Sequence, residues 1–199
     1  MQGCKKVVSI QDISGLSRCS LTVVIPVLSA MGIQVCPVPT AVLSAHTGYS
    51  EFVMRDLTDF MKPALEHYKK MDMKFDCVYS GFLASSEQID HCLEFFEAFP
   101  DALKVVDPVM GDGGKAYKTY TKELCSRMVE LVKVADIITP NLTEAAILLG
   151  EEYPTASMRS SEIKSWLVRL SKQGAKIVVI TSVNLADGGM STVGYDKEN

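Results

Sequence analysis

Residues 107–112 read DPVMGD and residues 139–144 read TPNLTE, and each segment follows a short apolar run, at 103–106 and at 136–138. Both runs have the length and the apolar composition of strands buried in a parallel sheet. The polar residues that follow them should therefore emerge at the carboxyl ends of one sheet, where α/β proteins bind their ligands. Acidic groups beside Thr and Asn, with no Cys or His among them, suit a hard cation such as Mg²⁺.

Strand-like and helix-like segments alternate along the whole chain. The expected strands are short and bounded by Gly, Pro, Asp or Asn, and they cover residues 6–10, 33–38, 76–80, 103–106, 136–138 and 177–181. The expected helices repeat apolar residues at helical spacing and cover residues 20–31, 55–68, 86–99, 121–132 and 160–173, with Thr121 as one N-cap. This alternation predicts an α/β fold of βαβ units around a mostly parallel sheet. Because no long linker interrupts the series, residues 1–199 should form a single domain.

The composition is that of an ordinary globular protein, with 47% hydrophobic and 22% charged residues. A net charge of −4 and the lack of any run of like charges argue against binding to nucleic acid or to an anionic membrane surface. The six cysteines are scattered without zinc-ligand spacing, so free thiols in a reducing compartment are expected. Because no apolar stretch approaches the roughly 20 residues that span a bilayer, we expect a cytoplasmic protein.

Five short segments carry a family resemblance: SIQD at 9–12, HTGY at 46–49, DPVMGD, TPNLTE, and VITS at 179–182. In this order and approximate spacing they resemble the pyridoxal kinase branch of the ribokinase-like superfamily. The resemblance implies a three-layer sandwich in which helices flank a mostly parallel central sheet. It also implies transfer of the γ-phosphate of ATP to the 5′-hydroxymethyl group of pyridoxal, pyridoxine or pyridoxamine, with Mg²⁺ as cofactor, and assembly into homodimers.

The resemblance places the nucleotide at the carboxyl ends of the later strands. The nucleotide-binding residues that it implies are Asp107, Asp112, Asn141, Glu144, Thr181 and Ser182. The metal site that it implies comprises Asp107, Asp112, Thr139 and Glu144.

Structural roles compete with these assignments in the DPVMGD segment. Asp107 precedes a proline and can cap a turn, whereas Asp112 can be a solvated loop carboxylate. The glycines at 113–114 favour a flexible loop after the strand. Residues 111–115, GDGGK, lack the glycine spacing and the final Ser or Thr of a Walker A phosphate loop.

The later segments also allow structural roles. Asn141 can be the N-cap of a helix with Glu144 three positions later, which makes a variant of the capping box, and this role is compatible with ligand binding. Thr181 and Ser182 can be hydroxyls that cap the end of the last clear strand. Both readings stay open from the sequence alone.

The resemblance also implies a site for the substrate ring, formed by Ser9, Gln11, Asp12, His46, Thr47 and Phe82. A pyridine ring needs a polar contact at its nitrogen or phenolic oxygen and apolar cover over its faces, which this mixture supplies. Gln11 and Asp12 are expected to end the first strand. Asp12 departs from several family members, which carry a small hydroxyl residue there. His46 is about as readily structural as functional, even beside Thr47.

The superfamily takes its general base from the Asp of a Gly-x-Gly-Asp motif, whose backbone amides also form an anion hole. The sequence up to Asn199 does not contain this motif. The chain therefore resembles the front two-thirds of a kinase, the base is expected after Asn199, and the chain alone should be inactive. Two rivals stay open: a hydroxymethylpyrimidine kinase of the same fold, and a catalytically silent vitamin-binding or assembly module.

Overall fold

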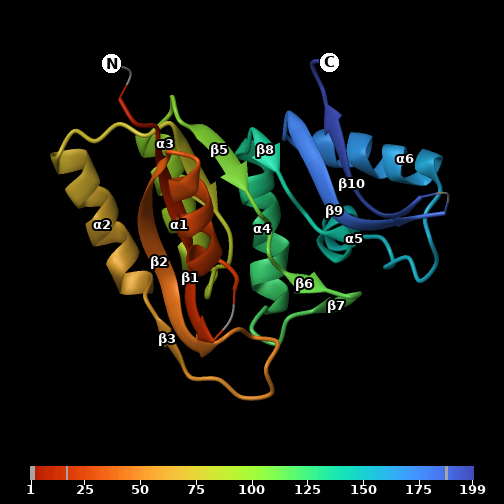
Figure 1. Ribbon diagram of the computed structural model, residues 1–199, viewed down its shortest axis with the longest axis horizontal. Coiled ribbons are helices and arrows are strands. Elements are labelled where there is room, and N and C mark those ends of the chain that lie inside the picture. The colour runs from red at the N-terminus through yellow and green to blue at the C-terminus, as the bar shows by residue number, and fades with distance from the viewer. Residues whose placement is uncertain (1–2, 17, 187) are drawn as a thin grey trace. The chain divides into compact units, whose positions relative to one another are not determined.

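The structure, a computed structural model, describes residues 3–16, 18–186 and 188–199. The chain separates into two compact units, one up to Lys104 and one from Val105 onward. Each unit combines parallel strands with helices, which confirms the α/β class (Figure 1). The single-domain organisation stays a prediction. Within the described ranges, no helix is both long and apolar enough to cross a membrane.

The strands of the first unit run in the order β4-β1-β2-β3. Strands β1, β2 and β4 are parallel, and the short β3 is antiparallel to β2. The strand bounds are Lys6–Leu16 for β1, Gln34–Ala45 for β2, Met54–Asp56 for β3 and Cys77–Ser80 for β4. The helix bounds are Leu21–Ala30 for α1, Thr58–Lys70 for α2 and Glu87–Ala98 for α3. Figure 1 shows α1 in front of β1 and β2.

The core of the first unit is built around β1, which has a strand on each side. Val8 pairs with Val78 and Ile10 pairs with Val38, and all four side chains are fully buried. Residues 7–12 are buried without a break, so both faces of β1 are covered. The polar side chains within this run must therefore find their partners inside the protein.

The strands of the second unit run in the order β10-β9-β8-β5. Strands β5, β8 and β9 are parallel, and β10 forms an antiparallel hairpin with β9. The strand bounds are Leu103–Val106 for β5, Ile137–Ile138 for β8, Ile177–Leu185 for β9 and Gly189–Asp196 for β10. A separate hairpin joins β6, Gly111–Asp112, to β7, Lys115–Ala116. The helix bounds are Lys122–Val134 for α4, Leu142–Leu149 for α5 and Ser160–Ser171 for α6.

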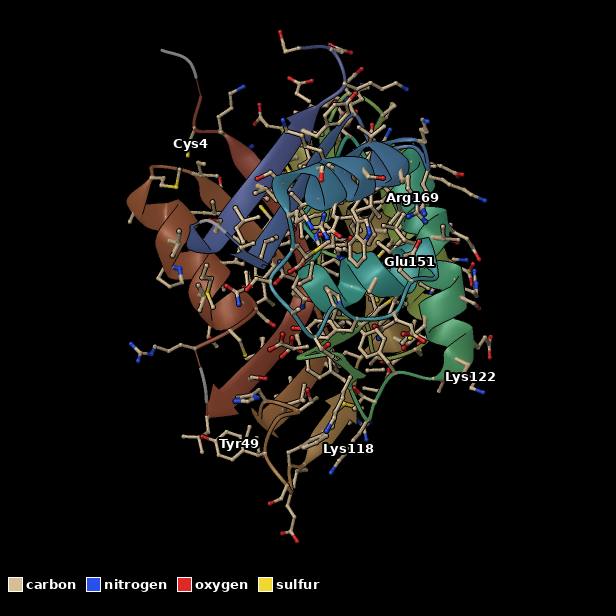
Figure 2. The ribbon with its side chains drawn as sticks, turned by 90° about the vertical axis from the view of Figure 1, so that its right-hand side faces the viewer. Cys4, Tyr49, Lys118, Lys122, Glu151 and Arg169 are labelled. Carbon is tan, nitrogen blue, oxygen red and sulfur yellow. The ribbon has the colours of Figure 1, made fainter. Side chains whose placement is uncertain are left out.

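Local sequence chemistry fixes the ends of these helices. The Thr121 hydroxyl accepts a hydrogen bond from the Leu124 amide at 3.1 Å, which confirms Thr121 as the N-cap of α4. Helix α5 ends at Gly150, whose φ of 66° is a left-handed conformation that favours glycine. Next to it, Glu151 forms an ion pair of 2.7 Å with Arg169 of α6, and both side chains are labelled in Figure 2.

Strands β1 and β2 are longer than the sequence predicts. They continue to Leu16 and Ala45 because they pair with each other beyond Ser80, where β4 ends. The expectation that Gln11 and Asp12 end the first strand is therefore wrong, since both lie inside β1. Their side chains are held by a rigid strand instead of by a loop.

Strand β9 is also longer than predicted, because the β10 hairpin supports it as far as Leu185. Thr181 and Ser182 therefore lie inside the strand and do not close it. Ser182 has a φ of 57°, and the pairing register shifts around it. This combination is a β-bulge, which interrupts the ladder and redirects the local side chains.

Two further elements differ from the predicted boundaries. Gly113 and Gly114, expected in a flexible loop, form the turn of the β6–β7 hairpin with φ values of 57° and 79°. Two consecutive positive values are typical of a type I′ turn, whose twist suits a hairpin. Helix α2 begins at Thr58, later than predicted, because residues 54–56 pair with β2 as strand β3.

Candidate functional site

In the second unit, neighbouring strand ends bring the two polar segments together. Asp107 follows β5 directly, and the amide of Thr139, after β8, donates to the carbonyl of Val106 at 3.0 Å. The Thr181 amide of β9 donates to the Pro140 carbonyl at 2.9 Å. The expectation that both segments emerge at one sheet edge is confirmed.

Glu144 ties these segments to the start of α5. Its Oε2 accepts from the amide of Asn141 at 2.7 Å, and its Oε1 accepts from the amide of Met110 at 3.1 Å. In return, Oδ1 of Asn141 accepts from the amides of Thr143 and Glu144 at 2.8 and 3.0 Å. This is the capping box that the sequence allows. The buried carboxylate thus also fixes the segment that follows Asp107.

The electrostatics of the pair are unfavourable for two negative charges. The pKa of Glu144 is raised to about 8: burial is the largest cause, the charge of Asp107 acts in the same direction, and backbone hydrogen bonds from Asn141, Met110 and Gly111 oppose the shift. Burial also raises the pKa of Asp107 to about 7. Two neighbouring carboxyl groups whose pKa values are raised toward neutral pH mark a candidate functional site.

The metal ligands implied by the sequence do not all gather around this pair. Asp112 is exposed, and its Oδ1 accepts from the amide of Gly113 at 2.8 Å. Thr139 is half-buried. In the part of the chain that the structure describes, no three His, Cys, Asp or Glu side chains are grouped to hold a metal ion. Asp107 and Glu144 still fit Mg²⁺, which commonly takes one or two carboxylates and completes its shell with water and phosphate oxygens.

The β6–β7 hairpin is anchored to the beginning of α5. Nδ2 of Asn141 donates to the carbonyl of Gly111 at 2.8 Å, and the amide of Gly114 donates to the hydroxyl of Thr143 at 2.9 Å. Asn141 therefore uses both ends of its amide inside the protein. Ser182, at the β9 bulge, is exposed, while Thr181 is half-buried beside Asn141.

In the first unit, the residues of the expected ring site lie on both faces of β1. Nε2 of Gln11 donates to the hydroxyl of Ser9 at 3.2 Å, whereas the hydroxyl of Ser14 donates to Oδ2 of Asp12 at 2.7 Å. Residues two apart on a strand share a face, so these two pairs point in opposite directions. All four side chains are almost completely buried.

Phe82 is held by a buried hydrogen-bond network after β4. The hydroxyl of Thr40, on β2, donates to the carbonyl of Phe82 at 2.8 Å. Gln88 of α3 donates to the Thr40 carbonyl and to the Thr58 hydroxyl, both at 2.9 Å, and accepts from the amide of Ala84 at 2.8 Å. This network joins β2, α2 and α3 to the loop that carries Phe82.

The loop after β2 has a local structure of its own. Nδ1 of His46 accepts from the amide of Gly48 at 3.0 Å. The rings of His46 and Tyr49 pack edge to face, with their centroids 4.9 Å apart. A side chain at Gly48 would collide with the His46 ring. Tyr49 is labelled in Figure 2, and Thr47 beside it is half-buried. These contacts favour a structural role for His46 and leave Thr47 available to a ligand.

Comparisons with known proteins identify the family. The family model described as phosphomethylpyrimidine kinase matches residues 25–199, which is most of the chain. This chain belongs to that family.

A structural relative in this family comes from Bacteroides thetaiotaomicron and is provisionally named a phosphomethylpyrimidine kinase. That structure, a crystal form with pyridoxal, is 45% identical and has a TM-score of 0.94 over 98% of this chain and 70% of its own. A pyridoxal kinase from Leishmania donovani, in complex with ADP and pyridoxamine, is 26% identical, with a TM-score of 0.78 over 96% of this chain and 72% of its own. These similarities confirm the ribokinase-like fold.

A curated relative is pyridoxal kinase PdxY of Deinococcus radiodurans, which is 28% identical over 178 residues. The match covers 83% of this chain and 58% of that protein's length. The chain thus spans little more than half of this relative. The resemblance that the five short segments carry is confirmed, while the roles of individual residues stay predictions.

Two residues near the candidate site were missed by the family resemblance. Ser14 orients Asp12, and extending the first strand would have revealed it, because Ser14 is two positions further on the same face. Gln88 holds the Phe82 loop, but a glutamine in the first turn of a helix gives no sequence signal of burial.

Proposed function

We propose that this chain forms the nucleotide-binding and ring-binding parts of a kinase that transfers the γ-phosphate of ATP to the 5′-hydroxymethyl group of pyridoxal, pyridoxine or pyridoxamine. The observation that carries the proposal is the pair of neighbouring carboxyl groups beside the amino terminus of α5, the half-buried Asp107 and the buried Glu144. Such a pair is costly to a protein that binds no cation there. Membership of a kinase family supports the same reading.

The nucleotide side follows from the chemistry of a helix start. The amino terminus of α5 carries partial positive charge and favours phosphate oxygens. Asp107 and Glu144 would hold Mg²⁺, which supplies charge neutralisation for the phosphates when bound. Because both oxygens of Glu144 already accept backbone hydrogen bonds, this residue suits contact with metal-bound water better than direct ligation. Asn141 orients the helix start itself.

The ring side is proposed from the first unit. Asp12, Thr47 and Phe82 offer an acceptor, a hydroxyl and an apolar face, which together suit a substituted pyridine ring. The pyridoxal in the crystal form of the Bacteroides relative supports a B6 compound as the substrate. We assign the base that deprotonates the acceptor hydroxyl to no residue of this chain, so binding is the property to measure first.

The second candidate is hydroxymethylpyrimidine kinase activity, which the description of the family model favours. This substrate also carries a hydroxymethyl group on an aromatic nitrogen ring, so it would use the same nucleotide site. A direct comparison of the dissociation constants for pyridoxal and for 4-amino-5-hydroxymethyl-2-methylpyrimidine separates the two functions. We expect tighter binding of pyridoxal.

Calorimetric titration of the chain tests the proposal. Mg·ADP and pyridoxal should each bind, and Thr47→Ala should raise the dissociation constant for pyridoxal about 5-fold or more, because a buried polar partner left unpaired costs about 1–3 kcal/mol. Thr155→Ala, the same change at an exposed position, is the matched control. Pyridoxal binding without Mg·ADP binding would instead indicate the silent vitamin-binding module.

Two further parts of the proposal concern the cellular state of the protein. All six cysteines are free, which supports a reducing, cytoplasmic location. The homodimer that the resemblance implies is tested by sedimentation equilibrium at several concentrations, where a monomer at all of them would contradict it.

A further inference from the structure

The side chain of Asp12 is buried and has almost no hydrogen-bonding or ionic partner among the described residues. Its exposed fraction is only 4%, and its one hydrogen bond is the 2.7 Å bond that Oδ2 accepts from the Ser14 hydroxyl. Among the residues that the structure describes, no Lys, Arg or His side chain forms an ion pair with it. A buried charge that lacks a counter-charge is strongly unfavourable, so its presence inside a strand calls for a partner from outside the chain.

The position of Asp12 allows a ligand to supply that partner. Strand β4 ends at Ser80, opposite Ile10, so it does not pair with Asp12. On the other side the register of β1 with β2 shifts between Gln11 and Ile13, which interrupts regular pairing at Asp12. Irregular pairing beside a strand end is common next to ligand sites, because it re-aims a side chain. Asp12 therefore lies inside β1 but beyond the level at which β4 ends, and α/β proteins bind ligands outside such carboxyl strand ends.

The Ser14 hydroxyl further defines what Asp12 can accept. It donates to one carboxylate oxygen and fixes the orientation of the group, while no described residue donates to Oδ1. Because Oδ2 already accepts from Ser14, the acceptor capacity that is left at Oδ1 suits a partner that donates a hydrogen bond. Charged donors form the shortest and strongest hydrogen bonds to a carboxylate.

From these observations we infer that Asp12 determines ring specificity by accepting a hydrogen bond from the protonated nitrogen of a pyridinium ring. A 3-hydroxypyridine ring has a zwitterionic form, in which the phenolic proton has moved to the ring nitrogen. This form presents a cationic N–H donor in the plane of the ring.

The inference rests on the proposed function, because it takes the ring site of the first unit as the substrate site. To that function the inference adds a preference for a cationic ring over a neutral ring. An aminopyrimidine presents a neutral exocyclic amino group, which is a weaker partner for a carboxylate. The carboxylate thus favours B6 compounds over pyrimidines by charge in addition to shape.

The test compares two ligands and two variants by calorimetric titration. Pyridoxine is compared with its benzenoid analogue, in which C–H replaces the ring nitrogen. The unmodified chain should bind pyridoxine about 10-fold or more tightly than the analogue, which is the lower end expected for a hydrogen bond to a charged group. Asp12→Asn should reduce this preference to a few-fold, and Asp12→Ser should do the same. Asp72→Asn, at an exposed carboxylate paired with Lys74, should leave it unchanged.

Binding of Mg·ADP and the circular dichroism spectrum report on folding of each variant. If Asp12→Asn keeps the full preference for pyridoxine while Mg·ADP binding is intact, the inference about Asp12 is wrong and the proposed function stands. If the unmodified chain binds Mg·ADP but neither ring, the proposed substrate and the role of Asp12 are both wrong. A lost preference in both Asp12 variants, together with an unchanged preference in Asp72→Asn, supports the inference.

Discussion

The negative charge of Asp107 raises the pKa of Glu144, although the two carboxyl groups come from different segments of the chain. The strand end after β5 supplies one group and the first turn of α5 supplies the other. Burial acts on both in the same direction. Burial therefore resists ionisation of both acids and the charge of Asp107 further resists that of Glu144, whereas a bound cation would favour the ionised forms.

The first prediction concerns stability against pH without a cation. The folded-state pKa values, about 7 for Asp107 and about 8 for Glu144, lie above the ordinary values of 3.8 and 4.5. Between about pH 4 and pH 8 the folded chain thus retains protons that the unfolded chain has released, so the free energy of unfolding should fall as the pH rises. Urea unfolding in the presence of a chelator measures this slope. Glu144→Gln should flatten it, and an unchanged slope would argue against the raised pKa.

The second prediction concerns Mg·ADP. If Asp107 and Glu144 hold Mg²⁺ as proposed, Mg·ADP binds their ionised forms and should raise the Tm more at about pH 8 than at about pH 6. Asp107→Asn should abolish most of the gain. Asp112→Asn should have a smaller effect, because Asp112 is exposed and accepts from its neighbour's amide. Thermal unfolding of the three proteins with and without Mg·ADP decides the matter, and equal losses in both variants would place Asp112 in the site as well.

The third prediction concerns the buried glutamine. Gln88→Leu should lower the free energy of unfolding by about 2 kcal/mol or more, because it leaves the Thr40 carbonyl and the Ala84 amide without their partner. Gln34→Leu, the same change at an exposed position, is the matched control and should cost much less. Urea unfolding measures both variants. A cost in Gln88→Leu no larger than in the control would mean that the network contributes little.

The fourth prediction concerns the cost of Asp12 to the fold. Asp12→Asn removes a buried charge that has no counter-charge, keeps the shape of the side chain, and should raise the Tm by a few degrees. The same variant should bind pyridoxine more weakly. Differential scanning calorimetry without ligand provides the measurement. A lower Tm would show that the charge is stabilised by a feature other than the Ser14 hydrogen bond.

The sequence predicted those parts of the site that depend on neighbouring residues. The capping box of Asn141 and Glu144 is written in four consecutive positions, and the strand before Asp107 is a local apolar run. The burial of Gln88 depends instead on contacts with other segments of the chain, so no local sequence pattern predicts it. The extension of β1 to Leu16 likewise depends on pairing with β2, which only the folded chain supplies.

The direction of side chains was the other feature that the sequence did not predict. Gln11 and Asp12 are consecutive in SIQD, and the resemblance assigned both to one ring site. Their hydrogen bonds to Ser9 and Ser14 place them on opposite faces of β1. Consecutive residues in a strand point to opposite faces of the sheet, so a motif that lies in a strand is divided between the two faces. The same motif in a loop is not divided in this way.

The side-chain amide of Asn141 joins the start of α5 to the β6–β7 hairpin by hydrogen bonds. One end of this side chain caps the helix and the other holds Gly111, while Thr143 holds Gly114 at the turn. The hairpin cannot swing away without breaking two hydrogen bonds and disturbing the helix that carries Glu144. A phosphate group arriving at this helix end would therefore meet a surface that is already assembled, and little ordering entropy would be lost on contact.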